Sequence, residues 1–141
     1  MRLEVEKQPP IEGVKEARVR SAILALRSYG PSSFASLTDG QGNYLQVAGG
    51  GVTCMLERRD AVNGKHFRAH LDTPSNVFPD GTVLAFGGGE LKLAADEWLA
   101  APLVVEAFVA FLNGKALPTT IKWRDMTAMF PELADKSSPA E

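Results

Sequence analysis

The chain has 141 residues, of which 45% are hydrophobic and 23% charged, an ordinary balance for a soluble globular protein. A net charge of −2 argues against nucleic-acid binding through bulk attraction, and the single cysteine excludes an internal disulfide framework. No secretory signal and no membrane-spanning apolar run is visible, so we expect a cytoplasmic protein with no membrane partner. The length favours one domain, over residues 1–134, followed by a disordered polar tail at 135–141.

The first third of the chain predicts a short strand and then a helix. Residues 2–6 alternate between apolar and charged side chains, as in a strand, and residues 12–28 keep roughly helical spacing until Tyr29-Gly30-Pro31. From Ser33 onward the apolar period changes to two, which predicts strands at 33–37, 44–47, 52–58 and 66–72. Glycine-rich turns separate them, and Asn63-Gly64 is the pair that tight hairpins favour.

The second half predicts two more strands and the most apolar helix. Residues 82–86 are apolar on both faces and therefore suit a central strand, and 90–93 alternate. From Pro102 to Leu112 the apolar residues recur at helical spacing, with proline suited to the first turn and Asn113-Gly114 to the end. Ile121 and Trp123 are predicted to anchor the returning chain. A last short helix is expected around Met126, Met129, Phe130 and Leu133.

These elements predict an α+β fold of two layers, a meandering antiparallel sheet with the two main helices packed on one face. Strand 66–72 places Phe67, Ala69 and Leu71 on the helix side. The opposite face then carries polar side chains and is expected to be wet; from this strand they are His66, Arg68, His70 and Asp72.

The residue patterns of catalytic and metal sites are weak here. The triplets Gly49–Gly51 and Gly87–Gly89 lead into strands without the Lys-Ser/Thr ending of a phosphate loop, so hairpin turns explain them better. His66 and His70 would lie about 13 Å apart on a strand at roughly 3.3 Å per residue, too far to share a metal. Cys54 is expected to be buried and structural. We therefore expect no enzyme activity, no metal and no cofactor.

Acidic side chains gather between residues 72 and 97. Residues 1–70 carry ten Lys/Arg and seven Asp/Glu, whereas residues 71–141 carry five and ten. Scattered charges usually mean only a solvated surface, but an acidic face for a basic partner is the sharper interpretation. Asp96-Glu97 also suits the positive end of the following helix dipole.

The segment 90–123 resembles a family of bacterial immunity proteins that accompany polymorphic toxins, often deaminase toxins. The similarity lies in the acidic Asp96-Glu97, the helix Val104–Leu112, the link Asn113-Gly114, then Leu117-Pro118 and Ile121-Lys122-Trp123. The preceding hairpins and N-terminal helix match the family's layout, and the glycine triplets depart from it. The resemblance implies a non-catalytic protein that binds one cognate toxin, one to one, and blocks its active site.

An acidic inhibitor suits a nucleic-acid-directed deaminase or nuclease, because the toxin's basic groove attracts carboxylates as it does phosphates. The candidate partner-binding residues are Asp72, Phe78, Asp80, Glu90, Asp96 and Glu97, with His66, Arg68 and His70 if the open sheet face participates. Two alternatives remain. One is an enzyme or small-ligand protein with a pocket between sheet and helices, near Cys54, and the other is a secretion adaptor for an effector.

Overall fold

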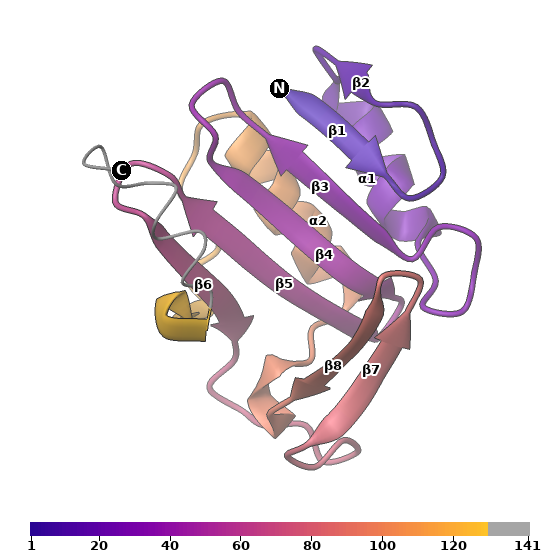
Figure 1. Ribbon diagram of the computed structural model, residues 1–141, viewed down its shortest axis with the longest axis vertical. Helices are drawn as coiled ribbons and strands as arrows, with labels where there is room; N and C mark the ends of the chain where they lie inside the picture. Colours follow the sequence, from indigo (N-terminus) through magenta and orange to yellow (C-terminus); the bar gives the residue numbers. More distant parts are fainter. Residues whose placement is uncertain (130–141) are drawn as a thin grey trace.

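Seven strands form one antiparallel sheet in this computed structural model, which describes residues 1–129 (Figure 1). Their spatial order is β2-β1-β3-β4-β5-β6-β9. The strands are β1 (Arg2–Val5), β2 (Ile11–Glu12), β3 (Phe34–Thr38), β4 (Tyr44–Gly50), β5 (Thr53–Asp60), β6 (Lys65–His70) and β9 (Lys122–Asp125). From β3 to β6, neighbours in the sequence are neighbours in the sheet, as a meander requires.

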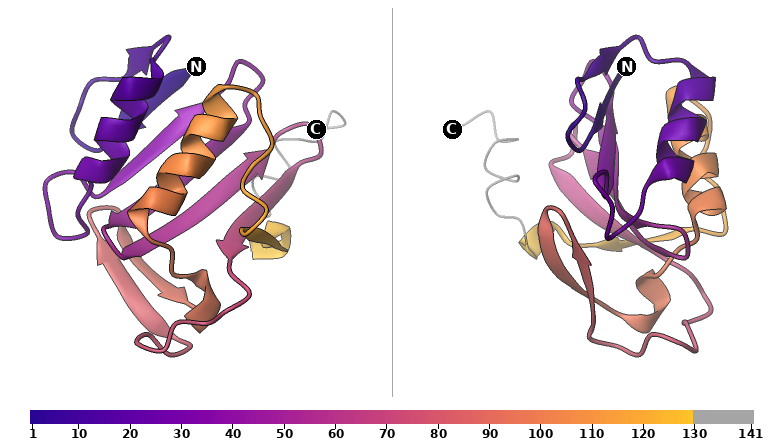
Figure 2. Two further views of the ribbon diagram at one scale, coloured as in Figure 1. Left: turned by 180° about the vertical axis from the view of Figure 1, so that it is seen from behind. Right: turned by 90° about the vertical axis from the view of Figure 1, so that its right-hand side faces the viewer.

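Two α-helices, α1 (Glu16–Ala25) and α2 (Ala101–Leu112), lie side by side on one face of this sheet (Figure 2). Their most buried side chains close the core against the apolar side of the central strands. The main members are Val19, Ile23, Val104 and Phe108 from the helices and Leu37, Leu45, Val47 and Leu56 from the strands. The predicted α+β architecture, with both helices on one face of an antiparallel sheet, is confirmed.

The ends of α2 follow the sequence signals. Pro102 lies in the first turn, where a missing N–H costs nothing. The chain leaves the helix at Asn113, and Gly114 adopts a φ of 67°, the left-handed conformation that glycine reaches without strain. Helix α1 is shorter than predicted, because the chain at Gly13 still has a φ of 60°. It begins at Glu16 rather than at residue 12.

A second, two-stranded sheet is made by β7 (Thr82–Phe86) and β8 (Gly89–Leu93). The prediction of a central strand at 82–86 is therefore wrong. The hairpin lies against the face of the large sheet that the helices leave open, and there Leu84 and Leu93 pack on Ala48 and Met55. Both faces of β7 carry apolar residues, but only one face packs. Leu84 is buried in this small cluster, whereas Val83 on the other face is exposed.

Three further predictions on strands and turns need correction. Strands β2 and β9 were not expected, although Trp123, which lies within β9, does pack against the core as predicted. The β5–β6 connection spans four residues, and only its last, Gly64, has a positive φ, so the two-residue turn predicted at Asn63-Gly64 is absent from this connection. Gly49 and Gly50 lie inside β4 rather than in a turn.

Gly50 allows a close approach between β4 and the end of α1. A Cβ atom at this position would collide with the backbone carbonyl oxygen of Leu26, which no side-chain movement can relieve. The glycine is thus required by packing between elements, whereas Gly87 and Gly88 do form the expected hairpin turn between β7 and β8.

The described chain ends in a 3-10 turn, η2 (Thr127–Met129), within the predicted last helix. Phe130, Leu133 and the predicted tail at 135–141 lie outside the described residues. Among residues 1–129, neither helix combines the length and apolar character needed to cross a membrane.

Candidate functional site

A row of polar side chains crosses the face of the large sheet opposite the helices, which we call the outer face. Each member is the registered partner of the next on the neighbouring strand, so their side chains share this face. This polar row consists of Glu4, Ser36, Gln46, Glu57, Arg68 and Arg124. Such a row arises because strand side chains alternate, so equivalent positions on five successive pairings face the same way.

Glu57 is the centre of the row, and its carboxylate is almost fully buried, with a side chain 4% exposed. One carboxylate oxygen accepts a hydrogen bond from Gln46 Nε2 at 3.0 Å and lies 3.1 Å from His66 Nε2. The other oxygen faces Arg68, whose Nε and Nη2 both lie 2.8 Å away. Both oxygens are therefore satisfied, as a charge in a dry site requires.

The ionic network continues from Arg68 toward β9. Arg68 also faces Glu97 at 3.6 Å, and Arg124 donates to the second oxygen of Glu97 at 2.7 Å. Arg124 in turn pairs with Asp96 at 2.9 Å, and His70 Nδ1 lies 3.6 Å from the same carboxylate. The network thus links β5, β6 and β9 to the 3-10 turn η1 (Ala95–Glu97).

The network keeps Glu57 and Asp96 ionised. Burial alone would raise the pKa of Glu57, but the hydrogen bond from His66 and the charge of Arg68 outweigh it and hold that pKa below its ordinary value. The hydrogen bond from Arg124 lowers the pKa of Asp96, and the same bond raises the pKa of Arg124. The carboxylates therefore act here as fixed anions rather than as proton donors near neutral pH.

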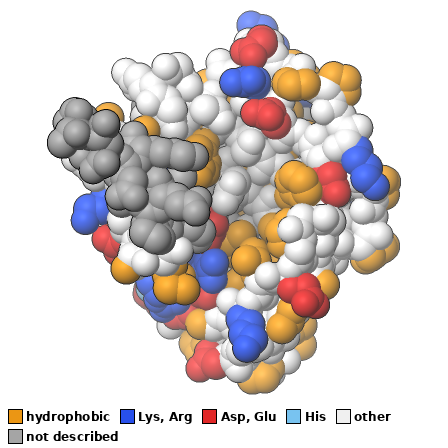
Figure 3. All heavy atoms as spheres, viewed as in Figure 1, with side chains coloured by type: hydrophobic (Ala, Val, Ile, Leu, Met, Phe, Trp, Pro, Cys, Tyr) orange, Lys and Arg blue, Asp and Glu red, His pale blue; other side chains and the backbone are white. Residues whose placement is uncertain are grey.

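A cavity of about 330 Å³ lies between the polar row and the β7–β8 hairpin, and we call it the hairpin cleft. One wall is the polar row, another is an adjacent apolar row of registered residues, and two hairpin side chains close the third side. These walls are Ser36, Gln46, Glu57 and Arg68, then Phe34, Ala48 and Met55, then Phe86 and Leu91. Figure 3 views this face and shows hydrophobic side chains gathered in its middle, beside the hairpin.

Hydrogen bonds attach the hairpin tip to the sheet. The N–H of Gly87 donates to Ser33 Oγ at 2.7 Å, and that hydroxyl donates to the Glu6 carboxylate at 2.6 Å. The hydrogen bonds that Glu6 accepts from the hydroxyl and the backbone N–H of Ser33 lower its pKa. The Phe34 and Phe86 rings meet edge to face at 5.9 Å. The cleft is thus a preformed feature with its hairpin held at the turn.

Most of the acidic residues predicted to bind a partner lie near the base of the hairpin, at the end away from the β7–β8 turn. The fold brings together three of the predicted partner-binding residues at the hairpin base. They border one hollow of about 620 Å³ and are Asp72, Asp80 and Asp96. Glu90 stands apart from them, exposed on β8. Phe78 is half-buried, with its ring 4.5 Å from that of Trp98.

Three other predicted contacts are poorly accessible to a partner. His66, Arg68 and Glu97 are 1%, 7% and 3% exposed. His66 and Arg68 do occupy the outer face, but the expectation that this face is wet is wrong at these positions. The carbonyl of Lys92 on β8 lies 3.4 Å from Arg68 Nη1, and the Tyr44 ring lies 6.3 Å from His66.

The remaining predicted residues also differ from expectation. Asp96 and Glu97 do not sit at the start of α2. They lie in η1, which ends four residues before Ala101, and they face Arg124 instead. His70 lies at the edge of the network, with a side chain 24% exposed.

Cys54 is buried, as predicted, with 1% of its surface exposed. Burial raises the pKa of its thiol to about 12. A thiol of that kind is almost wholly protonated near neutral pH and is therefore a poor nucleophile. Across residues 1–129, no three His, Cys, Asp or Glu side chains gather in a way that could hold a metal ion.

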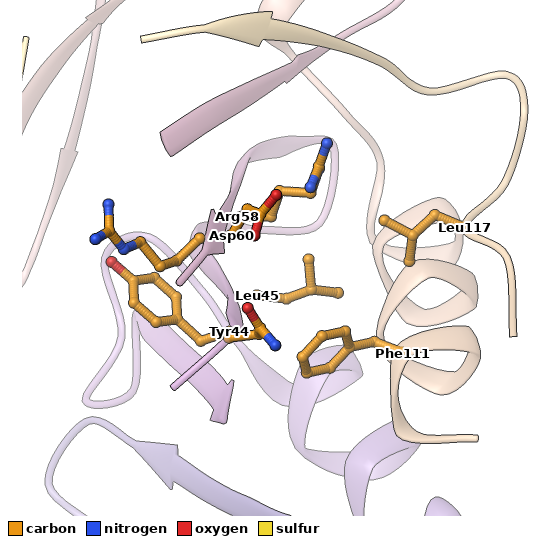
Figure 4. A pocket seen from close by; sticks show the side chains of 8 residues that line it. Tyr44, Leu45, Arg58, Asp60, Phe111 and Leu117 are labelled. Atoms are coloured by element: carbon orange, nitrogen blue, oxygen red, sulfur yellow. The ribbon is translucent and has the colours of Figure 1, made fainter. Parts of the chain in front are cut away.

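A second cavity, of about 250 Å³, opens on the helix side of the sheet. Figure 4 shows Leu45, Phe111 and Leu117 reaching it from β4, α2 and the loop after α2, with the Tyr44 ring directed away. The Arg58 guanidinium, which lines it, stacks 4.1 Å from the centre of the Phe67 ring and 5.0 Å from that of Trp123. The Arg58 cation is therefore already stacked on two aromatic rings, although Asn43, Arg59 and Asp60 also line this cavity.

The walls of the hairpin cleft were missed at the sequence level. The sequence pattern places Phe34, Ser36 and Gln46 in strands without indicating a function, and it does not distinguish Glu57 from other strand residues. The available signal was Glu57 itself, a lone acid after four residues of mostly apolar strand. Comparison with protein-family models and with curated proteins finds no match to this sequence.

Proposed function

We propose that this chain is an immunity protein, which binds a cognate bacterial toxin one to one and blocks its active site or its access to substrate. The hairpin cleft is the observation that carries the proposal. Binding energy at protein interfaces concentrates where a few anchor side chains enter a desolvated recess, surrounded by contacts that exclude water. The cleft provides an apolar recess beside a buried, hydrogen-bonded polar row.

The exposed acids near the hairpin support a basic partner. Asp72 and Asp80 flank the hairpin base and Glu90 lies on β8, all with exposed side chains. Rim charges of this kind act mainly on the rate of association, because they attract a basic surface before contact. A nucleic-acid-directed deaminase or nuclease has such a surface where it binds phosphates.

The test is recovery of the partner followed by neutralisation. A tagged copy of the full chain is expressed in the native bacterium, and co-purifying proteins are identified by mass spectrometry. We expect one stoichiometric partner that is toxic when expressed alone and harmless beside this chain. A partner whose toxicity is unchanged by co-expression would refute the immunity function and favour a secretion adaptor.

Two sets of variants then locate the interface. Phe86→Ala removes a cleft wall and should weaken partner binding at least tenfold, whereas Val83→Ala, on the same strand and 45% exposed, should not. Joint reversal of Asp72, Asp80 and Glu90 to lysine should slow association several-fold at low salt and leave dissociation unchanged. Asp96 and Glu97 are omitted because both are already paired with Arg124. Thermal unfolding of each variant checks that the fold persists.

A small-ligand-binding function is the second candidate, and the same cleft favours it. Its volume of about 330 Å³ lies at the lower end of the range for small-molecule sites, roughly 300–1,000 Å³. Apolar walls with a few polar groups are typical of such sites. Native mass spectrometry of the chain purified from the bacterium distinguishes the two, because a small-ligand protein is expected to retain a bound mass.

A further inference from the structure

We propose that the hairpin cleft receives a single aromatic side chain with a neutral polar tip, of the tyrosine type, from the bound partner. This inference rests on the proposed function, since it names the chemistry of the group that the cleft takes up. It follows from three properties of the cleft, namely its charge balance, its unused hydrogen-bonding groups and its aromatic walls.

The charges around the cleft are already balanced. The carboxylates of Glu57 and Glu97 face the guanidiniums of Arg68 and Arg124 at distances between 2.7 and 3.6 Å. An entering ammonium or carboxylate would find no opposite charge that lacks a partner, and it would lose its own hydration. Charge complementarity therefore favours a neutral occupant.

The wall formed by the polar row retains hydrogen-bonding capacity. Gln46 donates one amide N–H to Glu57, and the Ser36 hydroxyl has no hydrogen-bond partner within the described residues. Both side chains are half-buried and line the cleft. A purely aliphatic occupant would cover these groups without replacing their water, at a cost in free energy. A hydroxyl can donate to one of them and accept from the other.

The apolar walls suit a ring. The Phe34 and Phe86 rings meet edge to face with an interplanar angle of 80°, so an inserted ring can pack against both in the offset and edge arrangements that aromatic groups prefer. The side chains of Met55 and Leu91 complete these walls, and methionine sulfur packs favourably beside aromatic rings. A ring with a hydroxyl at its far end thus matches both sides of the cleft.

The decisive experiment uses p-cresol, the tyrosine side chain as a free molecule, titrated into the full chain and followed by amide NMR shifts. Toluene, benzylamine and benzoate serve as the apolar, cationic and anionic probes. We expect saturable shifts at the cleft residues, with p-cresol binding at least fivefold more tightly than toluene and more tightly than either charged probe. Toluene binding as tightly as p-cresol, or a charged probe binding more tightly, would overturn the inference.

Two matched variants fix the location. Ser36→Phe fills the cleft from its polar wall and should abolish the p-cresol shifts, while Thr38→Phe, one side-chain repeat further along the same face of β3, should leave them unchanged. Equal p-cresol binding by both would also refute the assignment. Failure of p-cresol together with intact toxin neutralisation rejects the tyrosine-type occupant alone. Binding of p-cresol without any neutralised partner rejects the immunity function instead.

Discussion

The pair Glu57–Arg68 provides the sharpest test of the ionic network, because each partner can be removed alone or together with the other. Glu57→Leu leaves the Arg68 guanidinium in a site where its side chain is only 8% exposed. Arg68→Met leaves the Glu57 carboxylate, 4% exposed, without its cation. Both substitutions roughly conserve volume, so the perturbation is chiefly electrostatic.

The magnitude follows from what remains around each orphaned charge. Breaking a buried ion pair by removing one partner costs about 3–5 kcal/mol of unfolding free energy. Here the lower value applies, about 3 kcal/mol for each single variant, because Arg68 keeps Glu97 and Glu57 keeps Gln46 and His66.

The double variant removes both charges, so no unpaired ion of the pair remains. Its cost is reduced to the lost interactions of the three neighbouring groups, Gln46, His66 and Glu97, at roughly 1 kcal/mol each. We therefore expect it to be about as stable as either single variant, which means a coupling free energy of about 3 kcal/mol.

The measurement is urea unfolding followed by the fluorescence of the two tryptophans, with linear extrapolation to water. A matched surface control is Glu16→Leu, which removes the exposed Glu16–Arg20 pair and should leave the unfolding midpoint nearly unchanged. Additive single and double variants would refute the reasoning, because they would show that the two groups are solvated independently in the native protein.

Three further outcomes are expected. First, because the pKa of Glu57 is lowered from 4.5, the unfolded state binds more protons than the native state in acid. Stability should therefore fall as pH drops below about 4.5, and Glu57→Gln should flatten this dependence in unfolding measured from pH 6 to 3; an unchanged slope would contradict the shift. Second, Gly50→Ala should lower the thermal midpoint strongly because its Cβ meets the Leu26 backbone, whereas Gly40→Ala, which has open space, should not; equal midpoints would contradict the close approach. Third, Cys54 should react with a disulfide reagent at least 100-fold more slowly in the native chain than in urea, and fast native labelling would show that it is accessible.

The helix layer of the fold was predictable because its signals are local. Pro102 and Gly114 act within one or two turns of the helix that they bound, and the apolar face of α2 repeats every turn. Strand alternation likewise assigned His66 and Arg68 to the correct face of β6. Each of these inferences needs only neighbouring residues, so a single sequence carries them.

The burial of the outer face was not predictable in the same way. Alternation tells which side of a strand a residue occupies, but it is silent about what covers that side. Here the cover comes from a hairpin some 20 residues further along, whose turn is attached through Gly87 and Ser33. The prediction of a central strand at 82–86 was wrong for the same reason. Apolar residues on both faces of a strand fit either a sheet interior or a small hairpin packed on another sheet.

The candidate site depends on register, which is the step that the sequence alone leaves open. Gln46, Glu57 and Arg68 are 11 residues apart in turn, and they become neighbours only because both connecting hairpins have the lengths that bring these positions opposite one another. A one-residue slip in either pairing would turn one side chain toward the helices, where Leu45 and Leu56 now pack. A buried carboxylate has a high cost in an apolar core, so the apolar layer under the helices and the polar row on the outer face enforce the same register from opposite sides of the sheet. The polar row and the apolar layer therefore favour the same pairing of β4, β5 and β6.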